Sequence, residues 1–153
     1  ELYPVFLRAL LLLGMTLGEQ GNTARGLAVL EHAANLYPSD PGAQFNLGVA
    51  YGAVGRTDDE IRAYERALEG EPDLTNAYLN LGAAHLAAGR PEAAADAWRK
   101  GIIVNPLSAG LYRNLSTVLA QTGDFEGAGK ARQRADAIAG RPTGPPPGTV
   151  PPQ

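Results

Sequence analysis

The chain has 153 residues, a formal net charge of −3 and no cysteine. Charged residues make up 19% of it and form no basic cluster, so we do not expect a nucleic-acid partner. The absence of cysteine excludes disulfides, thiolate catalysis and cysteine metal sites, and no apolar run reaches the ~20 residues that a membrane-spanning helix needs. The length is that of one domain, and a start at Glu1 predicts a processed protein or a piece of a longer one.

The first segment predicts a short lead over residues 1–6 and a helix that runs to about residue 19. This helix has almost no polar face, and Arg8 is its only charge before Glu19. A helix that is apolar on all sides is normally buried on all sides, so we expect another surface to cover it. Its exposed-face candidates are Leu10, Leu11, Leu12, Leu13 and Leu17.

The next helix is predicted over about residues 23–36, because the residue before Pro38 disfavours helical geometry. Another helix is expected to begin at about Pro41, since proline suits a first helical turn. The run from Thr57 to Glu60 predicts a capping box, in which the Thr57 hydroxyl accepts a hydrogen bond from the Glu60 amide. Its acidic residues are expected to complement the positive end of a helix rather than to bind a metal.

Residues 75–108 are the most regular stretch, with a helix, a turn at Gly89, a second helix from Pro91 and an end at Pro106. Trp98 is expected in the core. A shift of 34 residues returns the same pattern. The recurring residues are Gly14, Gly48 and Gly82; Leu13, Leu47, Leu81 and Leu115; Gly21, Gly55, Gly89 and Gly123; and Pro38, Pro72 and Pro106.

With this period and pattern, the chain resembles the tetratricopeptide repeat family. Four units fit without insertion. They span residues 7–40, 41–74, 75–108 and 109–140. The resemblance implies an all-α fold, a right-handed superhelical solenoid of four helix-turn-helix units with eight helices. Such a fold mostly supplies a binding surface, so it says little about a particular function.

The last segment changes in composition. Gly140 is expected to cap the last helix, and residues 141–153 are rich in proline, glycine and threonine. This composition favours an extended tail in polyproline II geometry. Thr143 and Thr149 lie among prolines, as in O-glycosylated stalks, and are candidate glycosylation sites. The sequence leaves extracellular, periplasmic and cytoplasmic locations open.

Few side chains are arranged for chemistry. His32 and His85 lie about a repeat and a half apart, without a second ligand at metal spacing, so we expect both to be structural. No nucleophile elbow, phosphate loop or paired carboxylates are recognisable. The sequence therefore predicts a protein that is not an enzyme and has no cofactor or metal. A repeat subunit attached to a catalytic domain is the remaining alternative.

In the family that the chain resembles, the first helix of each unit lines a concave groove. The sixth positions of these helices are Leu12, Asn46, Asn80 and Asn114. Asparagine amides can pair with the backbone of an extended peptide, or they can bond their own solenoid. The other predicted groove residues are Leu11, Met15, Phe45, Val49, Leu79, Ala83, Leu86, Arg113, Thr117 and Gln121.

This groove is mostly apolar, with Arg113 its only basic residue. Family members that hold acidic peptide ends use lysine or arginine there, so the resemblance implies a neutral or proline-containing peptide. The predicted function is therefore a protein-binding scaffold.

The alternative is self-assembly into a head-to-tail filament, with an extracellular, O-glycosylated tail as one form of it. In a filament the apolar first helix would stack on the last repeat of the next copy. The last repeat would supply Ala128, Ala131, Ala135 and Ile138.

Overall fold

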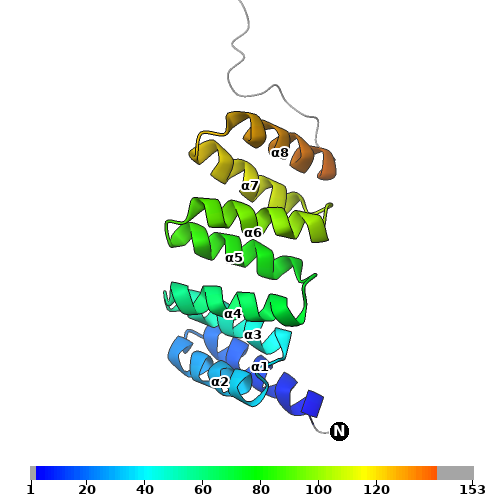
Figure 1. The fold of residues 1–153 in the computed structure, drawn as a ribbon. Coiled ribbons are helices and arrows are strands. Elements are labelled where there is room, and N and C mark those ends of the chain that lie inside the picture. The colour runs from blue at the N-terminus through cyan, green and yellow to red at the C-terminus, as the bar shows by residue number, and fades with distance from the viewer. Residues whose placement is uncertain (1–2, 141–153) are drawn as a thin grey trace, which may run out of the picture.

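The computed structural model describes residues 3–140, with side chains from Val5 onward. Helices are the regular structure of this part of the chain, so the predicted all-α fold is confirmed (Figure 1). The eight helices within residues 3–140 are α1 (Tyr3–Glu19), α2 (Thr23–Leu36), α3 (Pro41–Ala53), α4 (Thr57–Gly70), α5 (Thr75–Ala87), α6 (Pro91–Val104), α7 (Ala109–Gln121) and α8 (Phe125–Ile138).

The helices form four hairpins stacked in one column. Each helix packs against the next one in the chain, and α1 also contacts α3 while α5 contacts α7. Figure 1 shows α1 and α2 at one end of the column and α8 at the other. We call α1, α3, α5 and α7 the A helices, and α2, α4, α6 and α8 the B helices. Every repeat thus contacts only its neighbours, as in a solenoid.

A glycine in left-handed geometry closes each hairpin. Gly55 and Gly89 have φ angles of 73° and 70°, and the equivalent Gly21 and Gly123 are also positive. At Gly89 the following amide, that of Arg90, donates to the His85 carbonyl at 2.9 Å, which pairs one of the helix's last carbonyls. A side chain would disfavour this φ, so the predicted turn glycines are explained by backbone geometry.

The start of α4 differs from the prediction. Thr57 is the first helical residue, and the Glu60 amide donates to the Arg56 carbonyl at 2.9 Å, so the predicted capping box is wrong. The Glu60 side chain lies instead in the space that Gly52 leaves free, where an added Cβ would lie 2.7 Å from Oε1. Burial there raises the pKa of the Glu60 carboxyl. Side-chain caps occur at Asp40 and Asp124, which accept hydrogen bonds from backbone amides three residues later.

The core repeats with the sequence. Leu30, Tyr64 and Trp98 occupy the same position of successive B helices and are 3%, 2% and 2% exposed, which confirms Trp98 as a core residue. The Trp98 indole N–H is also paired, since it donates to the Leu79 carbonyl at 3.1 Å. Small alanines at other repeat positions let the helices approach closely. Those with no exposed surface are Ala33, Ala43, Ala67, Ala77 and Ala94.

The two ends of the chain depart from the repeat. Helix α1 begins at Tyr3, inside the segment 1–6 that was expected to be a lead, and is 17 residues long. At the other end, Gly140 follows α8 with φ of 67°, in agreement with the predicted helix cap. The predicted extended tail, residues 141–153, lies outside the described residues.

Candidate functional site: the groove of the A helices

Two hollows of nearly equal size lie at equivalent places in the solenoid. One, of about 400 Å³, is formed by α1, α2 and α3, and the other, of about 410 Å³, by α5, α6 and α7. Both are predominantly apolar. Their shared positions differ by two repeat lengths, so the same architecture produces both. The equivalent pairs are Met15 and Ala83, Leu30 and Trp98, Asn46 and Asn114, and Val49 and Thr117.

The structure therefore brings most of the predicted groove residues together around these hollows. Phe45 also lines the first hollow, and Leu86 lines the second. Val49 is 45% exposed at the edge of the first hollow, so an apolar side chain meets solvent there. Arg113 is exposed and Leu79 is half-buried, and neither lines either hollow.

A tyrosine fills the equivalent position between the two hollows. Tyr64 of α4 is 2% exposed, and its ring lies 5.7 Å from that of Phe45, measured between centroids. Asn80 donates to the Tyr64 hydroxyl at 3.2 Å. Burial is the main cause that raises the pKa of Tyr64 to about 12, so the hydroxyl stays protonated. The middle of the groove is thus filled by a side chain, while hollows lie on either side of it.

The three asparagines of the groove have different partners. Asn46 donates to the Gly42 carbonyl of its own helix at 2.8 Å, and Asn80 donates to Tyr64. Asn114 makes no hydrogen bond within residues 3–140, and all three side chains are half-buried. Two of the three amides therefore bond their own solenoid, which was one of the two sequence-based alternatives.

The tetratricopeptide repeat model matches residues 11–74, 50–100 and 79–145, which together cover most of the chain. The chain belongs to the tetratricopeptide repeat family. Its right-handed solenoid presents a surface to protein partners, so the groove of the A helices is the candidate site. No curated protein sequence matches the chain.

Solved structures give the same fold. The crystal structure of MamA is 23% identical, with a TM-score of 0.83 over 88% of this chain and 78% of that one. A second MamA crystal structure, also 23% identical, has a TM-score of 0.81 over 90% and 75% of the two chains. PilF of Pseudomonas aeruginosa is 20% identical, with a TM-score of 0.75 over 86% and 60%. At these identities the likeness extends to the fold alone.

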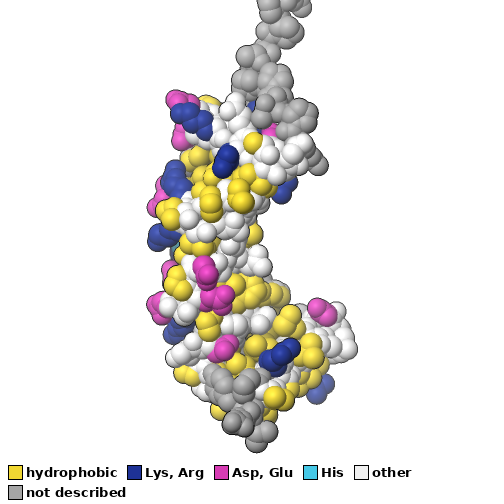
Figure 2. All heavy atoms as spheres, turned by 90° about the vertical axis from the view of Figure 1, so that its right-hand side faces the viewer, with side chains coloured by type: hydrophobic (Ala, Val, Ile, Leu, Met, Phe, Trp, Pro, Cys, Tyr) yellow, Lys and Arg dark blue, Asp and Glu magenta, His cyan; other side chains and the backbone are white. Residues whose placement is uncertain are grey.

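The surfaces expected to join copies end to end are unequal. Leu12 and Leu13 of α1 are 67% and 49% exposed, so this tetratricopeptide solenoid has an apolar surface at its first helix. Figure 2 shows hydrophobic side chains gathered at that end of the molecule. Leu10, Leu11 and Leu17 are half-buried.

At the other end, the prediction that alanines of the last helix form an exposed apolar surface is wrong. Ala128, Ala131 and Ala135 are 7%, 7% and 1% exposed. They face inward, and Ala128 and Ala131 belong to a core cluster that includes residues of α7. Only Ile138 of the predicted set is half-exposed. The last helix therefore packs these alanines inside the chain, although its first residue, Phe125, is 75% exposed.

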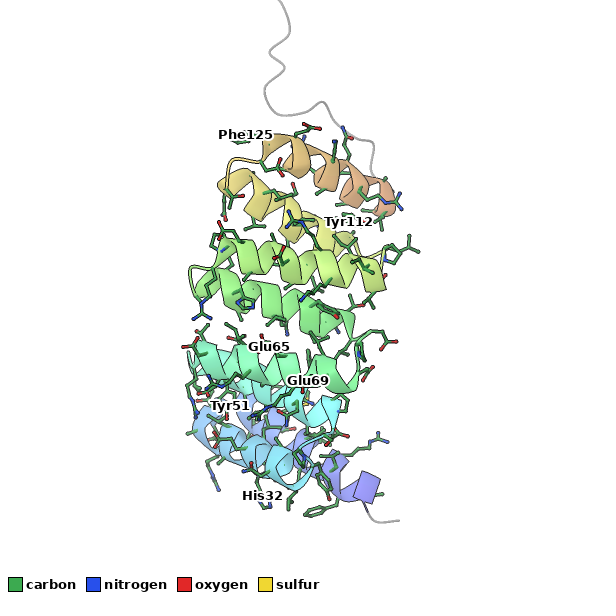
Figure 3. The ribbon with its side chains drawn as sticks, viewed as in Figure 1. His32, Tyr51, Glu65, Glu69, Tyr112 and Phe125 are labelled. Carbon is green, nitrogen blue, oxygen red and sulfur yellow. The ribbon has the colours of Figure 1, made fainter. Side chains whose placement is uncertain are left out.

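The two histidines do not form a metal site. His32 is exposed on α2 and is labelled in Figure 3, whereas His85 is half-buried in α5, and its Nδ1 has no hydrogen-bond partner among the described residues. Within residues 3–140, no group of three histidine, aspartate or glutamate side chains is placed to hold a metal. No helix in the same range is long and apolar enough to cross a membrane. Thr143 and Thr149 lie outside the described residues.

Proposed function

We propose that the protein is a non-enzymatic scaffold that binds an extended, neutral or proline-containing peptide of a partner along its A helices. The observation that carries this proposal is the pair of equivalent apolar hollows, each with an asparagine at its edge. Two anchors along one face suit a chain that runs across several repeats. The family's fold supports a protein partner but does not name one.

The chemistry of the lining favours this class of peptide. Each hollow would take one apolar side chain, whose burial contributes ~1.5–3 kcal/mol. Proline suits such a surface, because polyproline II segments are already extended and lose little entropy on docking. The side-chain amide of Asn114 has both its oxygen and its NH2 group available for a peptide backbone. Asn46 and Asn80 already use their NH2 groups, so they offer their oxygens.

Charge argues against an acidic peptide. Arg113 is the only basic side chain among the predicted groove residues, and it lies outside both hollows. The first hollow is instead lined in part by an acidic residue, Glu19. A carboxylate clamp of several basic side chains, which an acidic peptide end would need, is not assembled by these residues.

Selection from a random displayed peptide library would test the proposal. We expect neutral sequences with two separated apolar or proline residues to be enriched. Val49→Glu and Ala83→Glu, one for each hollow, should each weaken the selected peptide by about tenfold or more, equal to ~1.4 kcal/mol. The matched control is Ile103→Glu, since Ile103 is 81% exposed on α6 and lines neither hollow. Equal losses for all three variants would contradict binding in the groove.

The alternative is a head-to-tail filament, which needs an exposed apolar surface at each end of the solenoid. The exposed leucines of α1 favour it, but the buried alanines of α8 remove the complementary surface. Light scattering over a range of concentrations separates the alternatives. Filaments that dissociate with both Leu12→Glu and Ile138→Glu would support head-to-tail stacking, whereas a parent protein that stays monomeric would exclude it.

A further inference from the structure

A polar hollow lies outside the groove, between α2, α3 and α4. Its volume is about 280 Å³, and most of its lining is polar, in contrast to the two apolar hollows of the groove. Tyr51 of α3 contributes to it and is labelled in Figure 3, in the region between α2 and α4. The polar side chains that line it are Glu31, Asn35, Gln44, Tyr51 and Arg66.

Gln44 is the buried polar side chain of this hollow, at 2% exposed. Its Nε2 donates to the Pro38 carbonyl at 3.0 Å, which fixes the orientation of the amide. Its Oε1 is then left buried without a hydrogen-bond partner in the described part of the chain. A buried acceptor without a partner is energetically unfavourable, and such groups are rare in folded proteins. A donor entering the hollow would remove that cost.

The equivalent residue in the next repeat shows what the NH2 group of Gln44 does, but not why its oxygen is there. Tyr78 lies 34 residues after Gln44, and its hydroxyl donates to the Pro72 carbonyl at 3.1 Å. Both side chains thus make the same bond to the proline that closes the preceding repeat. The tyrosine makes it without adding a second polar atom, so the unpaired oxygen is a property of Gln44 alone.

The rest of the lining is already ordered and carries both signs of charge. Glu31 accepts from the Tyr51 hydroxyl at 3.1 Å and from Arg56 at 3.2 Å, so its carboxylate is held in place. Burial is the main cause that raises the pKa of Tyr51, which keeps this donor protonated. Arg66 is exposed at the hollow and forms no ion pair within residues 3–140.

We propose that this hollow binds an amide group, with its N–H donating to Gln44 Oε1 and its carbonyl accepting from Arg66. A neutral amide fits best, because a cation would meet Arg66 and an anion would meet Glu31 and the glutamine oxygen. Two sources share this chemistry: the primary amide of an asparagine or glutamine side chain, and the secondary amide of a peptide bond. Asn35, at the same hollow, supplies a further donor and acceptor.

Titration of the isotopically labelled protein with small amides, followed by the NMR signals of the Gln44 side-chain amide, tests the proposal. Acetamide represents the primary amide and N-methylacetamide the peptide bond, and the tighter of the two identifies the source. We expect saturable shifts confined to residues that line the hollow. N,N-dimethylacetamide has no N–H and should give no saturable shift. Equal binding of this control, or tighter binding of methylguanidinium, would overturn the assignment.

Two variants connect the signal to the hollow. Gln44→Tyr keeps the bond to the Pro38 carbonyl, as Tyr78 does for Pro72, but removes the unpaired oxygen. It should weaken amide binding by about tenfold or more without lowering the melting temperature. Arg66→Ala, at an exposed position, should weaken it while leaving the fold intact. Shifts that stay linear with amide concentration in the parent protein would show that the hollow holds water only and would refute the proposal.

Discussion

In three of the four hairpins, a bulky residue of the B helix fills the space beside a glycine of the A helix. Gly48 faces Tyr64, and a Cβ added to Gly48 would lie 2.7 Å from Cε1 of the ring. Gly82 faces Trp98 even more closely. The fourth hairpin has Ser116 instead, and its hydroxyl donates to the Ala128 carbonyl at 2.8 Å. One position of the repeat thus sets the distance between the paired helices.

Gly82→Ala should therefore destabilise the protein. The new methyl group would overlap the Trp98 indole, which cannot move freely because its N–H is bonded to the Leu79 carbonyl. Overpacking of this kind costs ~1–3 kcal/mol. Gly129→Ala is the matched control, since nothing lies within 4 Å of its added Cβ, and it should stabilise α8 by up to ~1 kcal/mol. Urea unfolding of both variants measures the difference, and effects of the same sign would contradict this account.

His85 gives the stability a dependence on pH near neutrality. Burial lowers its pKa from the ordinary value of 6.5, opposed by the nearby Glu65 and assisted by Arg90. His85 lines a further hollow, to which Glu69, Asp96 and Lys100 also contribute. The unfolded chain therefore takes up a proton at a higher pH than the folded chain does. This contribution to the free energy of unfolding is intact above pH 6.5 and declines as the pH falls below that value.

His85→Tyr should flatten that dependence. Tyr51 is the natural model for the variant, because it occupies the same position one repeat earlier and bonds to Glu31, the equivalent of Glu65. The free energy of unfolding would be compared at about pH 7.5 and about pH 5.5, where the parent should lose stability at the lower value. His32→Gln, on the exposed histidine, should retain the parent's loss. Equal slopes for the parent and both variants would sink the assignment to His85.

At the scale of helices, the sequence predicted the features that depend on neighbouring residues, namely helix ends and turns. Proline and left-handed glycine fix where helices start and end, so α2, α3 and the turns agree with expectation. The box at Thr57 failed because α4 already begins at Thr57, with Arg56 as its N-cap, and because Gly52 on a neighbouring helix leaves space for the Glu60 side chain. A local motif does not show that space. The two apolar hollows could not be predicted from short sequence motifs either, because each is formed by side chains from three helices.

Helix α3 provides a test of capping. Asp40 accepts from the Ala43 amide at 2.8 Å, whereas Ser108, at the same place before α7, makes no side-chain capping bond. Asp40→Ala should cost ~0.5–2 kcal/mol, because an amide of the first turn loses its partner. Ser108→Ala should cost much less. The comparison uses chemical denaturation at one pH, and a larger loss at Ser108 would mean that α7 is capped differently in solution.

At the scale of the molecule, the stability and the proposed binding groove both come from the stacking of repeats. In a solenoid, each A helix packs between the B helix of its own hairpin and the preceding hairpin. The burial of a residue therefore depends on its place in the stack. The same stacking places equivalent residues at regular intervals along the groove, and variation between repeats then decides where it is hollow. Tyr64 closes the middle position, whereas its equivalents Leu30 and Trp98 each border a hollow.

The leucine that recurs in each repeat can test how burial depends on the place of a residue in the stack. Leu47, Leu81 and Leu115 are 6%, 7% and 8% exposed, because the preceding hairpin covers them, whereas Leu13 of α1 is 49% exposed. Leucine to alanine at the three covered positions should cost ~2–5 kcal/mol, and Leu13→Ala clearly less. The free energies of unfolding of the four variants would be compared in dilute solution. A loss at Leu13 as large as at the others would mean that something covers α1 in solution, and a dependence of that loss on protein concentration would identify the cover as a second copy of the chain.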